Sequence, residues 1–306
     1  MTKTAFLFAG QGAQYLGMAR DLYEQYDVVK STFEEASQVL GYDVRALIDQ
    51  DEEKLNQTRY TQPAILTTSL AIYRLLAEKG IRPAMVAGLS LGEYSALVAA
   101  GALDFKTAVA LVAKRGAFME EAAPAGSGKM VAVLNADVAL IEETCHTASQ
   151  LGVVSPANYN TPGQIVIGGD VAAVDRAVEL LKEAGVKRLI PLNVSGPFHT
   201  ALLKPASEKL AQVLAETEFT EFQLPLVGNT EADIMEASRI KELLTRQIIE
   251  PVRFYDSIAK MQEAGVTEFI EIGPGKVLSG FMKKIDKSAI VHSVESVETL
   301  TALLEK

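Results

Sequence analysis

The chain has 306 residues, of which 48% are hydrophobic and 22% charged, and its formal net charge is -10. This composition is typical of a globular protein rather than a disordered one, and the length suits about two domains of roughly 150 residues. Binding to duplex nucleic acid needs a concentrated field of lysine and arginine, so the acidic balance argues against a nucleic-acid partner.

Cysteine content and hydropathy indicate the compartment. Cys145 is the single cysteine, so no intrachain disulfide can form. Residues 1–8 are too short and too mixed for a signal peptide, and no apolar run approaches the roughly 20 residues that span a bilayer. We therefore expect a cytoplasmic protein with no membrane partner.

The N-terminal half alternates short apolar runs with longer helical patterns, which is typical of a parallel sheet covered by helices. Strands are predicted at 4–8 and 85–87, and helices from about residue 18, from 63 to 80 and at 91–100. Pro63 is taken as a residue of the first helical turn, where proline is tolerated.

The pattern changes after residues 124–129, where Pro, Ala, Gly and Ser indicate a linker. The elements predicted beyond it are a strand at 130–134, a helix at 138–150, strands at 153–157 and 164–168, a helix at 171–184 and a strand at 188–194. This split βαββαβ order predicts a ferredoxin-like subdomain. Alternation of Ile190, Leu192 and Val194 predicts that both faces of the last strand are half-buried.

The βα pattern resumes after Phe198, with strands predicted at 267–272 and 290–294 and a Gly-Pro-Gly turn between them. The smaller unit is therefore interpreted as an insertion. The predicted fold class is α/β, with a larger α/β-hydrolase-like parallel-sheet domain, residues 1–126 and 196–306. The inserted ferredoxin-like βαββαβ subdomain covers residues 127–195.

The strongest local motif is Gly-Leu-Ser-Leu-Gly at 88–92, between an apolar strand and a helix. Glycines on both sides allow the strained turn that lifts a serine hydroxyl above a sheet. Ser90 is therefore the predicted nucleophile. The alternative is a tight turn with a capping serine.

A serine nucleophile needs a base within hydrogen-bond reach, and the chain has three histidines. His199 ends the Ser-Gly-Pro-Phe-His loop at 195–199, where the inserted unit returns to the larger one. Loops at such junctions often carry catalytic groups. His199 is the predicted base, the alternative being a histidine at a helix start, whereas His146 in a helix and His292 in a strand are interpreted as structural.

Two glycine-rich segments fail as phosphate sites. After Gly10 and Gly12, the third glycine position of the dinucleotide fingerprint holds Tyr15. The 126–129 segment is followed by Met130 instead of Ser or Thr, and it lacks the first glycine of a P-loop. We interpret the turn at 10–14 instead as a source of backbone N–H groups for an oxyanion. No cofactor or metal is expected.

Together these motifs resemble the malonyl-CoA:acyl carrier protein transacylases and the acyltransferase domains of fatty acid and polyketide synthases. The resemblance spans almost the whole chain. It rests on residues 8–14, 61–66, 88–94, Arg115, Asn158, 163–164, 195–199, Gln247, 251–252 and 271–275.

The resemblance implies a ping-pong transfer of the malonyl group from malonyl-CoA to the thiol of an acyl carrier protein, supplying fatty acid biosynthesis. Ser90 would be acylated, with His199 as its base and later acid. The backbone N–H groups of Gln11 and Leu91 would form the oxyanion hole. Gln247 would orient His199 through its main-chain carbonyl.

The resemblance also concerns substrate choice. Arg115 would bind the malonyl carboxylate, although in isolation its sequence context favours an exposed helix arginine. Leu89 stands where the family usually has histidine, which leaves the turn intact but removes a polar neighbour of the serine. Phe198 resembles members that take malonyl over methylmalonyl groups.

Two other functions remain open: a serine esterase or thioesterase, which would pass the acyl group to water, and a non-catalytic acyl-carrier binding protein. Arg115 and the extent of the resemblance favour transfer. Carrier proteins of this kind are acidic, so a positive surface near the cleft is expected. The candidates are Lys187 with Arg188, and Lys283 with Lys284 and Lys287.

Overall fold

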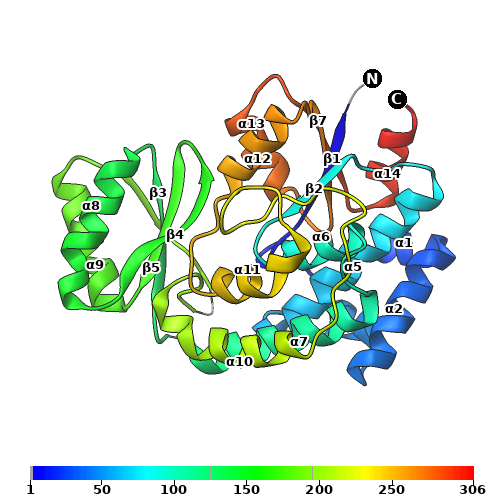
Figure 1. The fold of residues 1–306 in the computed structure, drawn as a ribbon, viewed down its shortest axis with the longest axis horizontal. Helices are drawn as coiled ribbons and strands as arrows, with labels where there is room; N and C mark the ends of the chain where they lie inside the picture. Colours follow the sequence, from blue (N-terminus) through cyan, green and yellow to red (C-terminus); the bar gives the residue numbers. More distant parts are fainter. Residues whose placement is uncertain (1–2, 125, 195) are drawn as a thin grey trace.

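Four parallel strands form the centre of the larger unit in the computed structural model, which describes residues 3–124, 126–194 and 196–306. Their order in the sheet is β2-β1-β7-β8 (Figure 1). The strands are β1 Thr4–Phe8, β2 Met85–Gly88, β7 Glu268–Ile272 and β8 Ile290–Val294. Because side chains alternate along a strand, Phe6 and Phe8 face one helical layer whereas Ala5 and Leu7 face the other.

Helices cover both faces of this sheet, as expected for parallel strands. The larger layer comprises α1 Arg20–Gln25, α2 Asp27–Leu40, α3 Val44–Gln50, α4 Glu52–Leu55, α5 Thr58–Glu78, α6 Gly92–Ala99, α7 Phe105–Ala122, α10 Lys204–Ala215, α11 Ile240–Gln247 and α14 Val297–Leu304. The other face packs against α12 Phe254–Glu263 and α13 Val277–Ile285. No helix in the described ranges is long and apolar enough to cross a membrane.

The smaller unit is an antiparallel sheet of order β4-β5-β3-β6 with two helices on one face, on the left of Figure 1. Its elements are β3 Lys129–Leu134, α8 Val138–Ala148, β4 Val154–Thr161, β5 Gln164–Gly169, α9 Val171–Glu183 and β6 Arg188–Pro191. This is the strand order of a split βαββαβ unit. The predicted α/β class with an inserted antiparallel unit is therefore confirmed.

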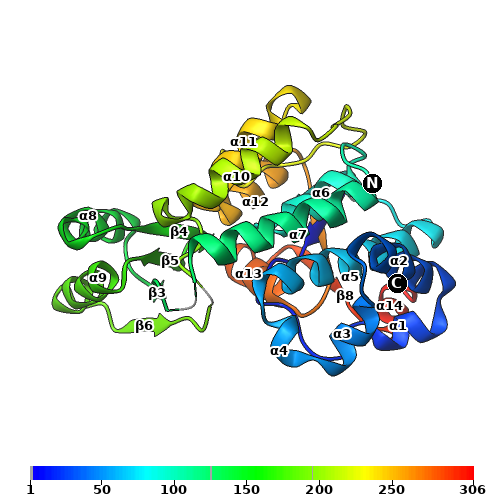
Figure 2. The same ribbon diagram turned by 90° about the horizontal axis from the view of Figure 1, so that it is seen from below.

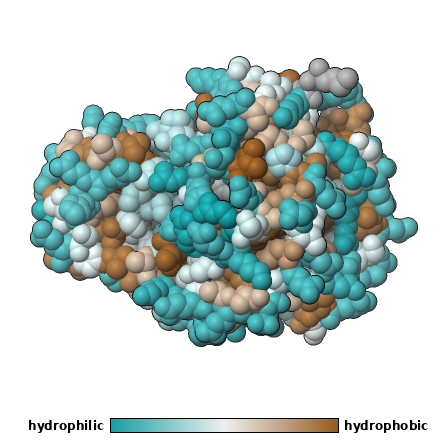
Figure 3. All heavy atoms as spheres, in the orientation of Figure 1, coloured by the Kyte–Doolittle hydropathy of each residue, from teal (hydrophilic) through white to brown (hydrophobic). Residues whose placement is uncertain are grey.

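The two units meet along β4. The backbone N–H of Tyr159 donates to the carbonyl of Val252 (2.8 Å), and the N–H of Val252 donates to the carbonyl of Ala157 (2.9 Å). Figure 2 shows the smaller unit beside the larger one, and Figure 3 shows a mainly hydrophilic face across both. The predicted domain division at 126/127 and 195/196 stays a prediction, because residues 125 and 195 lie outside the described ranges.

Two local predictions are wrong. α5 begins at Thr58, because the carbonyl of Gln57 already accepts from the N–H groups of Tyr60 and Thr61. Pro63 therefore lies inside the helix, where it cannot donate to the carbonyl of residue 59.

The last strand of the inserted unit also differs from its prediction. β6 ends at Pro191 rather than at residue 194, and it lies at the edge of its sheet. Ile190 and Val194 are 45% and 42% exposed, so that face is not half-buried as predicted. An edge strand has a neighbour on one side alone, which explains this exposure.

Candidate active site

Ser90 lies in a sharp turn between the last residue of β2 and the first residue of α6. A Cβ atom on Gly88 would overlap the backbone of Gly92, and one on Gly92 would overlap the carbonyl of Phe8. Both glycines are therefore required by the close approach of strand and helix. Ser90 has a φ of 53°, a strained left-handed conformation that is typical of functional turns.

His199 bridges Ser90 and Gln247. Its Nε2 lies 2.8 Å from the Oγ of Ser90, and its Nδ1 lies 2.7 Å from the main-chain carbonyl oxygen of Gln247. A carbonyl oxygen only accepts, so Nδ1 carries the hydrogen and Nε2 presents a lone pair to the serine hydroxyl. This arrangement suits a general base oriented by a neutral acceptor instead of a carboxylate.

The electrostatics of the site keep His199 neutral. Burial, followed by the positive charge of Arg115, lowers the pKa of His199 from 6.5 to about 4. The imidazole is therefore unprotonated near neutral pH and ready to accept the proton of Ser90.

Arg115 lies in the interior, with 1% of its surface exposed, and its guanidinium points at the nucleophile. It donates to the Oγ of Ser90 (3.2 Å) and to the side-chain oxygens of Gln62 (2.9 Å) and Gln247 (3.0 Å). The guanidinium also lies over the ring of Tyr94, 5.2 Å from its centroid. Burial lowers the pKa of Arg115.

The charge of Arg115 has no close counter-ion. The buried carboxylate of Glu93 acts on it only from beyond ion-pair distance, and burial raises the pKa of Glu93 to about 7. No ion pair to Arg115 forms within the described part of the chain, and its Nε is buried without a hydrogen-bond partner. Buried cations are normally paired. An anionic group entering beside Ser90 would complete this site.

The two N–H groups expected at the oxyanion hole flank the nucleophile. Leu91 follows Ser90 and precedes the first turn of α6, and Gln11 lines the same cleft as Ser90. Neither backbone N–H finds an acceptor among the residues with described positions. Their roles in an oxyanion hole stay predictions.

A cleft of about 250 Å³ opens next to Ser90 and His199 between the two units. Leu89, Phe198, Val277 and Phe281 contribute apolar surface from the larger unit. The smaller unit contributes the amide side chains of Asn158, Asn160 and Gln164. Such a mixed lining of apolar and amide groups suits an elongated ligand that reaches Ser90 from the surface.

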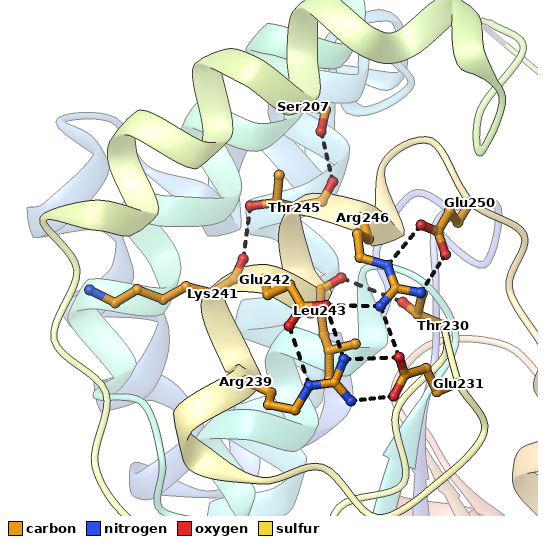
Figure 4. Close-up of polar contacts among 10 residues, drawn as sticks. All are labelled: Ser207, Thr230, Glu231, Arg239, Lys241, Glu242, Leu243, Thr245, Arg246 and Glu250. Carbon is orange, nitrogen blue, oxygen red and sulfur yellow. Dashed lines mark hydrogen bonds and ion pairs between the residues drawn. The ribbon is translucent and has the colours of Figure 1, made fainter.

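α11 supplies Gln247 as its last residue, and ion pairs hold this end of the helix (Figure 4). Arg246 donates to Glu250 (2.8 Å) and to Glu231 (2.8 Å), and Arg239 also donates to Glu231 (2.5 Å). Each of these exposed pairs contributes little alone, because solvent screens the charges. Together they join the end of α11, next to Gln247, to the loop that carries Glu231.

The structure therefore brings together the six predicted site residues from five separate segments of the sequence and leaves two histidines outside. His146 is exposed on α8, and His292 lies on β8 with Nε2 3.2 Å from an oxygen of Glu268. Sequence reasoning gave no role to Gln62, which accepts from Arg115, or to Asn229, which accepts from the N–H of Ser90 (2.7 Å). The motif at 61–66 contained a signal for the first but nothing singled out the second.

Comparison with known proteins identifies relatives over the whole length of the chain. The malonyl CoA-acyl carrier protein transacylase of Bacillus subtilis is 49% identical to this chain, covering 100% of the chain and 97% of that protein. The crystal structure of MCAT from Streptococcus pneumoniae matches with a TM-score of 0.98 at 73% identity, covering 99% of each chain.

A structure of a type II PKS acyl-carrier protein in complex with its malonyl-transacylase also matches, with a TM-score of 0.96 at 47% identity over 99% of each chain. The acyl transferase domain family matches residues 5–303. The resemblance inferred from the motifs is confirmed, and the chain belongs to the acyl transferase domain family.

Proposed function

We propose that the chain transfers the malonyl group from malonyl-CoA to the thiol of an acyl carrier protein, supplying fatty acid biosynthesis. Full-length relatives named for this activity support the assignment, as does the similar malonyl-transacylase solved with its acyl-carrier protein. We place the reaction in the cytoplasm, which the single cysteine favours.

The observation that carries the malonyl assignment is the buried charge of Arg115 beside Ser90, which forms no ion pair within the described residues. A guanidinium offers two parallel donors to one carboxylate, and in the malonyl group a single methylene separates the free carboxylate from the thioester carbon. A plain acyl group would leave this buried cation without a partner. The site is therefore matched to a carboxylated acyl group.

In the first half-reaction, Ser90 Oγ attacks the thioester carbon while its proton moves to Nε2 of His199. The N–H groups of Gln11 and Leu91 stabilise the negative oxygen. The C–S bond then breaks, and the leaving thiolate of CoA takes the proton from His199. The product is a malonyl ester of Ser90.

The second half-reaction reverses these steps with another thiol. His199 takes the proton of the carrier thiol, and the resulting sulfur attacks the ester carbon. The C–O bond to Ser90 breaks, and Oγ recovers its proton from His199. Gln247 keeps the imidazole oriented in both directions, since its carbonyl holds Nδ1–H throughout.

Intact mass measured after exposure to malonyl-CoA tests this function. A stable malonyl adduct on Ser90, discharged by carrier protein, is the expected result. Rapid loss of the adduct to water would indicate an esterase or thioesterase instead. Absence of any adduct would indicate a non-catalytic binding protein.

For the carrier protein we propose the exposed lysines of α13 as the docking surface. Lys283 and Lys284 have no ion-pair partner in the described ranges, and their helix also carries Val277 and Phe281 into the cleft. The other candidate pair, Lys187 with Arg188, lies next to Leu134 and Asn135 at a separate pocket. An acidic carrier placed on α13 would have its thiol arm near Ser90.

A further inference from the structure

The peptide groups around Ser90 are held by side chains from distant segments. The N–H of Ser90 donates to Oδ1 of Asn229 (2.7 Å), and the carbonyl of Ser90 accepts from Nε2 of Gln247 (3.0 Å). Nδ2 of Asn229 donates to the carbonyl of Gly88 (2.6 Å). One amide therefore joins the end of β2 to the nucleophile.

The chain places Asn229 below the turn by extending the parallel sheet. The carbonyl of Pro225 accepts from the N–H of Val86 (3.0 Å), and the N–H of Val227 donates to the carbonyl of Val86 (3.0 Å). Asn229 follows two residues later, fully buried, and its own N–H donates to Oε2 of Glu93 on α6 (2.6 Å). Its position is thus fixed from two sides.

The turn needs such support because Ser90 is not a glycine. A left-handed conformation is unfavourable for residues with a Cβ atom, and it persists only where surrounding contacts enforce it. Relaxation of this peptide would move Oγ away from Nε2 of His199. Because the N–H of Ser90 already donates to Asn229, it is not available to a ligand. The N–H of Leu91 is the next donor along this turn, and it can reach a ligand.

We propose that Asn229 is a positioning residue for acyl transfer, whose amide holds the Ser90 peptide so that Oγ stays aligned with His199. The inference rests on the proposed acylation of Ser90. It adds a residue 139 positions away in the chain to the group that forms the acyl-enzyme.

The first test is Asn229→Ala, with single-turnover acylation by malonyl-CoA as the measurement. The rate should fall by roughly tenfold to a hundredfold, the scale expected when buried hydrogen bonds to a reacting residue are lost. The KM for malonyl-CoA should stay within about twofold, because Asn229 does not contact Arg115 and is linked to it only through a long contact with Gln247 (3.4 Å). A change in stability alone would not separate rate from KM in this way.

Asn229→Asp supplies a rescue that depends on protonation. A neutral aspartic acid has one donor and one acceptor, as the amide uses here, whereas its ionised form has acceptors alone and would oppose the carbonyl of Gly88. Burial and Glu93 favour the neutral form, against the positive charge of Arg115. The ratio of variant to wild-type rate should therefore rise as pH falls from about 8 to 5. Taking the ratio removes the titration of His199 that both proteins share, whereas Glu93 would titrate together with the new carboxyl beside it.

Ser257→Ala is the matched control, because the Ser257 hydroxyl contacts the carbonyl of Gly228 (3.2 Å) in the same loop without touching the turn. Its acylation rate should equal that of the wild type. The proposal is overturned if Asn229→Ala acylates normally, if Asn229→Asp shows no recovery at low pH, if Ser257→Ala is equally slow, or if neither Asn229 variant folds. A wild-type adduct on a residue other than Ser90 would instead refute the proposed function.

Discussion

Replacing Arg115 with alanine tests whether this cleft selects a carboxylated acyl group. In the free chain the guanidinium is 1% exposed and bonded to the neutral amides of Gln62 and Gln247, so its charge is available to a ligand. A malonyl carboxylate bound there gives up its hydration in return for this partner. Removing one member of a buried ion pair typically costs about 3–5 kcal/mol.

At about 1.4 kcal/mol per tenfold, this loss lowers malonyl transfer by roughly two to three orders of magnitude or slightly more. Acetyl transfer should hold steady or rise, since acetyl has no carboxylate to leave unpaired. The assay is the ratio of kcat/KM for malonyl-CoA to kcat/KM for acetyl-CoA. Arg115→Lys should give an intermediate ratio, because lysine keeps the charge but loses the paired donors.

Arg74→Ala is the matched control for Arg115. Arg74 also stacks on an aromatic ring, 4.3 Å from the centroid of Phe105, but its ion pair is with Glu35 on α2. Its removal should leave the malonyl-to-acetyl ratio unchanged. An unchanged ratio in Arg115→Ala as well would refute the reasoning and place the carboxylate elsewhere.

The remaining predictions concern the nucleophile, the base and the carrier surface. Ser90→Ala should form no malonyl adduct by intact mass, and an adduct in that variant would mean that another residue is acylated. His199→Ala should slow transfer by roughly a hundredfold or more, with normal turnover pointing to a different base. Because the pKa of His199 is held at about 4, the wild-type acylation rate should fall only as the pH approaches 4, and a fall centred near 6.5 would contradict the neutral buried imidazole. Reversing Lys283 and Lys284 to glutamate should slow transfer to carrier protein but not to a small thiol. The wild-type rate with carrier protein should also drop as salt rises through about 0.15 M. If the variant and the wild type transfer to carrier protein at equal rates, the docking surface is instead expected at Lys187 and Arg188.

Features set by neighbouring residues could be predicted from the sequence. The turn around Ser90 needs glycine at both ends because strand and helix backbones touch there, and this requirement is visible in five consecutive residues. The strand order of the inserted unit followed from the succession of its elements. The start of α5 was missed because proline is a strong local signal, whereas hydrogen bonds to the carbonyl of Gln57 decide where that helix begins.

Asn229 could not be predicted, because its function depends on a contact that local sequence does not encode. It reaches Ser90 only after the segment at 225–227 has paired with Val86 of β2. The paired segment is a short apolar run between two loops. It lacks the length and the alternation of apolar and polar residues that predict a strand. Its position beside the nucleophile is therefore a property of the assembled sheet.

Arg115 shows the opposite case, in which a local signal was present and was outweighed. Leu111, Val112 and Met119 lie four, three and four positions from Arg115, so the arginine is on the apolar stripe of α7 rather than on its exposed side. A charged residue on such a stripe must be buried, and a buried guanidinium needs a partner. In the structure its direct partners are neutral amides, the Ser90 hydroxyl and a tyrosine ring, and Glu93 acts only from beyond ion-pair distance. The helical periodicity therefore contained the signal for a buried arginine with room for an anionic ligand.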